Sequence, residues 1–223
     1  MTATFRLSLC ALTVLALLLS STSQAGEITG FSWYSGIASV AGTTINPPSA
    51  PNNDNVAGPS PNGVFVTQKD YTGIGPVDLV FDVNDTGGTT EYQFVEGVAN
   101  NTGLDWSAYH IELGFGNGAG FVKSTVGDGL DFDAPDYDSV FDFNPSPGIF
   151  PSVTVTEDDV YASGGVMPYL AFAGYFKFAV DVPDGITSFT IRQSPVPVPE
   201  PSTIALAAIG LLGLFALRRR RES

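Results

Sequence analysis

The most constraining feature of this 223-residue chain is a β-type composition that extends from Gly26 to Val196. In that segment Val and Ile together number 27 against five Leu, and 23 glycines and 13 prolines interrupt the apolar runs every few residues. β-Branched residues favour strands, and frequent Gly and Pro favour the turns between them. No long stretch repeats its apolar residues at the helical period. The segment therefore predicts an all-β fold, a single antiparallel β-sandwich of the jelly-roll or immunoglobulin-like kind.

The clearest predicted strand runs from Tyr169 to Val182, because bulky apolar side chains occupy every second position. The positions that we expect to face the core are Leu170, Phe172, Phe176, Phe178, Val180 and Val182. Gly174 lies on the same face without a side chain, which predicts a bend or bulge there.

Four further strands are predicted at residues 77–83, 89–99, 106–115 and 121–125. The first two are separated by Asn84-Asp85-Thr86-Gly87-Gly88, whose residue types accept a positive φ, so we expect a hairpin. The turn at residues 100–103 would extend this hairpin into a meander. Shorter candidate strands lie at residues 28–34, 63–67, 140–143, 152–156 and 186–192.

The charge and the cysteine content exclude several functions. Between residues 26 and 196 the chain has 21 acidic and four basic side chains. Phosphate binding needs clustered Lys and Arg, so nucleic acid is excluded as a partner. Cys10 is the only cysteine and precedes this segment, which excludes a disulfide scaffold, a cysteine-ligated metal site and a thiol enzyme.

Residues 1–25 have the pattern of a secretory signal peptide. Arg6 lies in a short polar start, an apolar run follows at residues 7–19, and small residues at Ser23 and Ala25 fit the cleavage rule. We expect cleavage after Ala25, and a sandwich domain that occupies residues 26–194.

Three segments follow in order: a Pro-rich spacer at residues 195–203, an apolar stretch at residues 204–217 and a basic tail at residues 218–223. Proline fixes φ and donates no backbone hydrogen bond, so the spacer should be extended. We predict a transmembrane helix at residues 204–217. With the two preceding residues it would measure about 24 Å, short of a bilayer core of about 30 Å, so its arginines would snorkel at one edge. Arginines after an apolar helix stay in the cytoplasm, which places the acidic domain outside.

These C-terminal segments resemble the PEP-CTERM sorting signal of Gram-negative bacteria. The resemblance rests on Val198-Pro199-Glu200-Pro201-Ser202-Thr203, the short apolar stretch, and the run of Arg218, Arg219, Arg220 and Arg221. It implies that an exosortase, a transpeptidase-like membrane enzyme, recognises the Pro-Glu-Pro segment and cuts near it. It also implies a precursor tethered to the inner membrane, a product at the cell surface or outside the cell, and a bacterium that makes exopolysaccharide and biofilm. The alternative is a permanent single-span membrane protein with a proline-rich stalk.

Residues 95–109 resemble a strand-turn-strand piece of several secreted families of the choice-of-anchor kind, in which similar ectodomains have different surface anchors. The resemblance extends to about Asp131 and implies no chemistry. Its physical content is a turn at Asn100-Asn101-Thr102-Gly103, after which Trp106 enters the sheet.

The densest group of acids suggests calcium. The candidate ligands are Asp128, Asp131, Asp133, Asp136 and Asp138. Alternate residues of an extended chain point the same way, and hard oxygen ligands at such spacing suit Ca²⁺. The order of an EF-hand is missing, and the alternative is a solvated acidic loop. The second acidic run, Glu157-Asp158-Asp159, fits a surface turn.

Aromatic side chains on a flat face would allow sugar binding, since aromatic rings present large apolar surfaces with a polar handle. Trp33, Trp106 and Tyr109 are the main candidates, followed by Tyr34 and Tyr169. The alternative for all of them is packing in the core.

The sequence offers no recognisable catalytic motif. His110 is the only histidine, and no G-x-S-x-G segment accompanies it, so we expect a strand histidine and not a member of a Ser-His-Asp triad. We expect no enzyme activity, although a glycan hydrolase needs only two facing carboxylates. The sequence predicts a non-enzymatic surface or exopolysaccharide-matrix protein that is sorted by an exosortase. The alternative is a carbohydrate-binding or calcium-dependent adhesive module.

Overall fold

Strands dominate the computed structural model, which describes residues 26–46, 63–84, 88–132 and 149–199. Within these ranges every regular element is a β-strand except the 3₁₀ turn η1 (Gly118–Gly120), which confirms the all-β prediction. No helix in the described part of the chain is long and apolar enough to cross a membrane. The predicted signal peptide, the apolar stretch at residues 204–217 and the basic tail lie outside the described residues.

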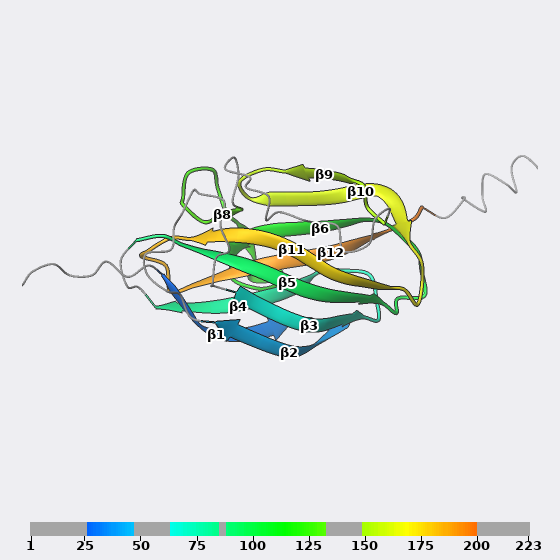
Figure 1. Cartoon of the computed structure of the whole chain (residues 1–223), viewed down its shortest axis with the longest axis horizontal. Coiled ribbons are helices and arrows are strands. Elements are labelled where there is room, and N and C mark those ends of the chain that lie inside the picture. Colours follow the sequence, from blue (N-terminus) through cyan, green and yellow to red (C-terminus); the bar gives the residue numbers. More distant parts are fainter. Residues whose placement is uncertain (1–25, 47–62, 85–87, 133–148, 200–223) are drawn as a thin grey trace, which may run out of the picture.

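The described strands form two sheets (Figure 1). The seven-stranded sheet has the order β1 (Glu27–Tyr34), β4 (Val77–Asn84), β12 (Ser188–Pro197), β6 (Trp106–Phe115), β10 (Asp159–Met167) and β9 (Ser152–Val155), and β7 (Val122–Lys123) pairs with β6. The five-stranded sheet has the order β2 (Ala38–Asn46), β3 (Gly63–Tyr71), β5 (Thr90–Asn100), β11 (Phe172–Val182) and β8 (Asp131–Phe132).

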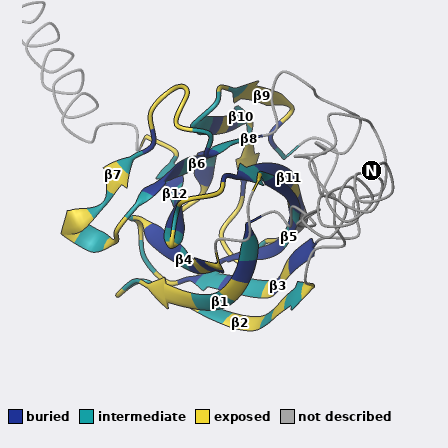
Figure 2. Cartoon of the chain, turned by 90° about the vertical axis from the view of Figure 1, so that its left-hand side faces the viewer, coloured by how far each residue is buried: buried dark blue, intermediate teal, exposed yellow. Residues whose placement is uncertain are grey.

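The two sheets pack face to face around an aromatic core. Viewed along the long axis of the molecule, β4, β6 and β12 lie on one side and β3, β5 and β11 on the other, with the buried residues between them (Figure 2). Ring pairs cross this layer: the centroids of Phe81 and Phe94 are 5.3 Å apart, and those of Tyr109 and Phe176 are 4.9 Å apart. Such contacts stabilise the packing beyond the apolar area that they bury. The architecture is a β-sandwich.

The predicted hairpin at residues 77–99 is wrong, and so is its extension to the strand at 106–115, because β3, β4, β5 and β6 lie alternately in the two sheets. The last step of the predicted meander is confirmed, since β7 pairs with β6 in antiparallel fashion. β4 pairs with β1 and β12, whereas β5 pairs with β3 and β11. The chain crosses from β3 to β4 and back to β5, and two reversals make β5 run in the same direction as β3. The two strands therefore pair in parallel, so the sandwich is mixed and not purely antiparallel. Turn residues indicate where a strand ends, but a crossing between sheets uses the same residue types as a hairpin.

The predicted bulge in the strand around Gly174 is confirmed, because the pairing of β11 with β5 shifts register between Phe172 and Tyr175. On the C-terminal side of the bulge, the predicted positions from Phe176 to Val182 are buried. On its N-terminal side, Leu170 and Phe172 are 69% and 51% exposed. Leu170 precedes β11 in a turn with a φ of 65°, and the bulge interrupts the alternation after Phe172, so the predicted buried face holds only from Phe176 onwards.

The sandwich extends further along the chain than the predicted boundary at residue 194, because β12 continues to Pro197. Its pairing with β4 ends at Gln193, and beyond that residue β12 pairs only with β6. Proline is tolerated where one side of a strand has no partner, since its missing N–H leaves no gap in a ladder. The first three residues of the predicted spacer thus belong to the folded domain.

Candidate functional site

Of the five predicted calcium ligands, the structure describes Asp128 and Asp131. Both oxygens of Asp128 accept a hydrogen bond from Ser124 Oγ at 2.8 Å, and further bonds come from the backbone N–H of Thr125 at 2.9 Å and of Leu130 at 3.1 Å. Burial alone would raise the pKa of Asp128, but these bonds outweigh it and hold the pKa below its ordinary value. Asp131 lies in β8 opposite Asp181. The carboxylate oxygens of Asp128 therefore accept hydrogen bonds within its own loop. A bound cation would need these same oxygens as ligands.

The other three predicted ligands, Asp133, Asp136 and Asp138, lie outside the described residues. Calcium binding by this region stays a prediction. Glu157, from the second acidic run, is tied to the same loop because its Oε2 accepts a hydrogen bond from the N–H of Gly127 at 3.0 Å.

The aromatic candidates divide between the core and the surface. Trp106 and Tyr109 are fully buried, which corrects the prediction that they bind sugar, because a ring enclosed by protein cannot stack on a ligand. Trp33 is 41% exposed and Tyr34 is 57% exposed on the edge strand β1, and Tyr169 is also exposed. Of the three main candidates, the structure leaves only Trp33 at the surface.

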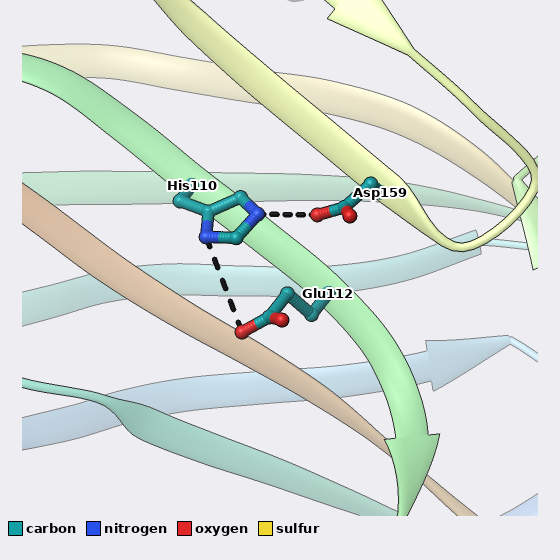
Figure 3. Close-up of side chains that lie close together, drawn as sticks. All are labelled: His110, Glu112 and Asp159. Atoms are coloured by element: carbon teal, nitrogen blue, oxygen red, sulfur yellow. Dashed lines mark hydrogen bonds and ion pairs between the residues drawn. The ribbon is translucent and has the colours of Figure 1, made fainter. Parts of the chain in front are cut away.

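An imidazole and two carboxylates meet on the outer face of the seven-stranded sheet (Figure 3). His110 and Glu112 are two residues apart on β6 and share a face, and Asp159 on β10 lies directly opposite Glu112. One potential ligand atom from each lies within 4.8 Å of the others, and each side chain is between 24% and 29% exposed. A nitrogen and two carboxylate oxygens are donors that suit a divalent transition metal.

The same cluster already contains a cationic side chain, Lys123. His110 Nε2 contacts Asp159, and the ammonium of Lys123 contacts Asp159 and lies 3.3 Å from the Asp158 carboxylate. Burial would lower the pKa of Lys123, but its bonds to Asp159 and Asp158 outweigh that effect and raise it. The cluster thus has the geometry of a cross-strand ion network as well as that of a metal site. Its members are up to 49 residues apart in the chain, so the sequence gives no sign that they meet.

A second polar cluster lies at the centre of the sandwich. Lys69 on β3 and Glu96 on β5 form an ion pair with both side chains fully buried. Lys69 Nζ also contacts Gln193 Oε1 on β12, and Gln193 Nε2 donates to Glu96 Oε2 at 2.7 Å. Tyr109 Oη donates to Gln193 Oε1 at 2.7 Å and lies 2.8 Å from Tyr71 Oη. We call these five residues the core polar cluster.

Burial changes the proton affinities in the core polar cluster. It lowers the pKa of Lys69, and the charge and hydrogen bond of Glu96 oppose that shift. It raises the pKa of Tyr71 and of Tyr109, so both hydroxyls keep their protons. The site therefore combines an amine that readily becomes neutral with two phenol donors.

A bulge in β3 brings Lys69 into the core. Val64 and Val66 face inward at even positions, whereas Lys69 and Tyr71 face inward at odd positions. The register with β5 shifts between Val66 and Lys69. A Cβ at Gly97 would lie 2.3 Å from the carbonyl oxygen of Thr67, so the bulge requires glycine at position 97. The predicted strand at residues 63–67 ended before Lys69, and continued alternation from Val64 and Val66 would have put Lys69 on the solvent side, so the sequence pattern does not reveal the core polar cluster.

In the comparison with protein families, residues 197–221 match the PEP-CTERM protein-sorting motif. A search of the curated proteins returns no match, and neither does a search of the solved structures. The motif begins at the last residue of β12, and the N–H of Val198 still donates to the carbonyl of Asp105 at 2.8 Å. The matched segment therefore follows the folded domain without an intervening linker.

Proposed function

We propose that this chain, which carries a PEP-CTERM protein-sorting motif, is a non-enzymatic protein of the cell surface or the exopolysaccharide matrix. The motif implies export and processing by an exosortase. We further propose that the protein is released from an inner-membrane tether in a Gram-negative cell and then has a structural role in the matrix. The observation that carries it is the position of the motif, which directly follows a folded β-sandwich.

The chemistry of the described residues supports a structural role. The most closely packed polar group, the core polar cluster, is fully buried, so an external substrate cannot reach it. The exposed cluster around His110 is held in ion pairs between β6, β10 and Lys123. The excess of acidic residues favours solubility outside the cell.

The test is Glu200→Ala in the full chain, expressed in a Gram-negative host that has an exosortase. We expect the uncut precursor to accumulate in the inner-membrane fraction and the released domain to decrease, as seen on an immunoblot of cell fractions. Glu222→Ala removes the same charge just outside the matched segment and should leave release unchanged. Normal release of the Glu200→Ala chain would contradict exosortase sorting through this motif.

The alternative function is carbohydrate binding, which the exposed rings of Trp33 and Tyr34 favour. Trp33→Ala should then weaken retention of the protein in gels that contain exopolysaccharide. Tyr161 is 41% exposed, as Trp33 is, so Tyr161→Ala is a matched control. Equal retention of both variants would argue against this function. A calcium-dependent form of the module would depend mainly on acids outside the described residues.

A further inference from the structure

The core polar cluster holds a lysine where simple packing would place an apolar residue. Lys69, Glu96 and Gln193 are each 0% exposed. Removing charges from water is costly, and an ion pair with two hydrogen-bond partners often recovers only part of that cost. Glu96 Oε1 is buried and has no hydrogen-bond partner among the described residues. If the only role of the cluster is to stabilise the fold, burying its charges costs free energy that apolar side chains would not cost.

The atoms of the core polar cluster are arranged as an acyl transfer requires. In such a transfer an amine replaces the nitrogen of an amide. The nucleophile is Lys69 Nζ, which contacts Gln193 Oε1 and so lies beside the side-chain carbonyl carbon. A single carboxylate oxygen, Glu96 Oε2, touches both the nucleophile and the leaving nitrogen, Gln193 Nε2. A group in this position can take a proton from one nitrogen and deliver it to the other.

The carbonyl oxygen is held by a donor that suits the negative charge formed during the reaction. Tyr109 Oη donates to Gln193 Oε1 at 2.7 Å, and Tyr71 Oη lies 2.8 Å behind it. A fixed donor in a site without water stabilises an oxyanion strongly. The aromatic rings around the cluster, Trp106 and Phe176 among them, are fully buried and complete a dry environment.

We propose that Lys69 and Gln193 become joined by an intramolecular isopeptide bond, which covalently links the two sheets. A proton first passes from the Lys69 ammonium to Glu96 within the ion pair. Neutral Nζ then attacks Cδ of Gln193, the proton on Glu96 moves to Nε2, and the Cδ–Nε2 bond of the tetrahedral intermediate breaks. Glu96 takes the surplus proton from the attacking nitrogen, so the products are a secondary amide, ammonia and a neutral carboxyl group. One amide bond is exchanged for another, ammonia is released, and no oxidant or external reactant is consumed.

Two further observations agree with this reaction. Desolvation lowers the pKa of Lys69, which increases the share of the neutral amine that can attack. The three groups come from β3, β5 and β12, and folding alone holds them in contact, so the step is effectively unimolecular. The product replaces the buried ammonium and carboxylate with a neutral amide and a neutral carboxyl group, and so removes the cost of burying both charges.

The test is peptide mass spectrometry of the full chain, purified after expression and digested with trypsin under denaturing conditions. The domain has four sites for trypsin, at Lys69, Lys123, Lys177 and Arg192. We expect no cut after Lys69, because an acylated lysine is not a trypsin site. We also expect one species in which the peptide containing Lys69 is joined to the peptide that begins with Gln193.

The joined species must be lighter than its two parts by one ammonia molecule. The joining is decisive, because a peptide that begins with glutamine can lose ammonia by itself. Cleavage after Lys69 with two separate peptides would overturn the proposal. A loss of water, with Lys69 bonded to Glu96, would overturn it too, since it would make the carboxylate the electrophile.

Variants test the assigned roles. Glu96→Gln keeps a side chain of the same shape but lacks the proton carrier, so the joined species should be absent from protein that remains folded by circular dichroism. Tyr109→Phe should slow bond formation after refolding by roughly 10²-fold or more, as loss of an oxyanion donor does. Lys177→Arg changes an exposed lysine and should leave the bond intact. If Glu96→Gln does not fold, the trypsin digest of the natural chain still tests the proposal, because it shows whether the two peptides are joined.

Discussion

Asn100 connects three chain segments at one end of the sandwich. Its side-chain N–H groups donate to the carbonyls of Leu104 at 2.9 Å, Met167 at 3.1 Å and Pro168 at 3.1 Å, and its Oδ1 accepts from Thr102. The residue is fully buried. Removing the amide would take one hydrogen-bond donor away from each of these three carbonyls.

We therefore expect Asn100→Ala to lower the free energy of unfolding by about 2 kcal/mol or more. The measurement is urea denaturation followed by tryptophan fluorescence. Asn101→Ala is the matched control, because Asn101 is exposed and its side-chain amide donates to Asp70 Oδ1 at 3.2 Å. An equal effect of the two substitutions would contradict the role given to Asn100.

Because of Asp128, the free energy of unfolding should depend on pH in the acid range. Its pKa is lowered from 3.8 in the folded state, so it adds stability above that value and loses it as the pH falls through the lower folded pKa. The advantage of the natural chain over Asp128→Asn should be fully present above a pH of about 4 and shrink as the pH falls below it. Thermal unfolding across this range measures it. The exposed Asp82→Asn is the control, and a difference between natural and Asp128→Asn chains that is constant with pH would contradict the expectation.

At the scale of the elements, the bulge in β3 decides which side chains enter the core. Gly97→Ala places a Cβ against the backbone carbonyl of Thr67, and backbone cannot move aside as a flexible side chain can. We expect a loss of about 1–3 kcal/mol in the free energy of unfolding. Gly36→Ala is the control, since a Cβ there meets nothing within 4 Å. Unchanged urea midpoints for Gly97→Ala would show that β3 and β5 can separate at this point.

The elements also show what the sequence could predict. Strand positions such as 77–83 and 106–115 follow from local alternation and agree with β4 and β6. The partner of each strand does not follow, because the same turn residues serve a hairpin and a crossing between sheets. The bulge at Gly174 could be predicted from a missing side chain in a regular pattern. The bulge beside Lys69 could not, because it depends on Gly97 in another strand. For the same reason the core polar cluster and the meeting of His110 with Asp159 were invisible in the sequence.

At the scale of the whole molecule, the C-terminal boundary of the domain is testable. A chain ending at Val198 keeps the pairing of residues 195–197 with β6, whereas a chain ending at Ser194 loses it. The shorter chain also loses the bond from Val198 N–H to Asp105 and the contacts of Ser107 Oγ with the carbonyls of Val196 and Pro197. We expect its free energy of unfolding to be lower by about 2 kcal/mol. Equal urea midpoints for the two chains would place the boundary at residue 194 after all.

The two ends of the sandwich domain leave it at opposite ends of the seven-stranded sheet. β1 and β12 are both antiparallel to β4, so they run in the same direction, and Glu27 starts near the end where β12 also starts. A mechanical load applied between the two ends therefore acts along the strands. Many backbone hydrogen bonds of β12 with β6 must then fail together, whereas a load across the strands would break them one at a time. A domain held at one end in flowing liquid would meet that load in its most resistant direction.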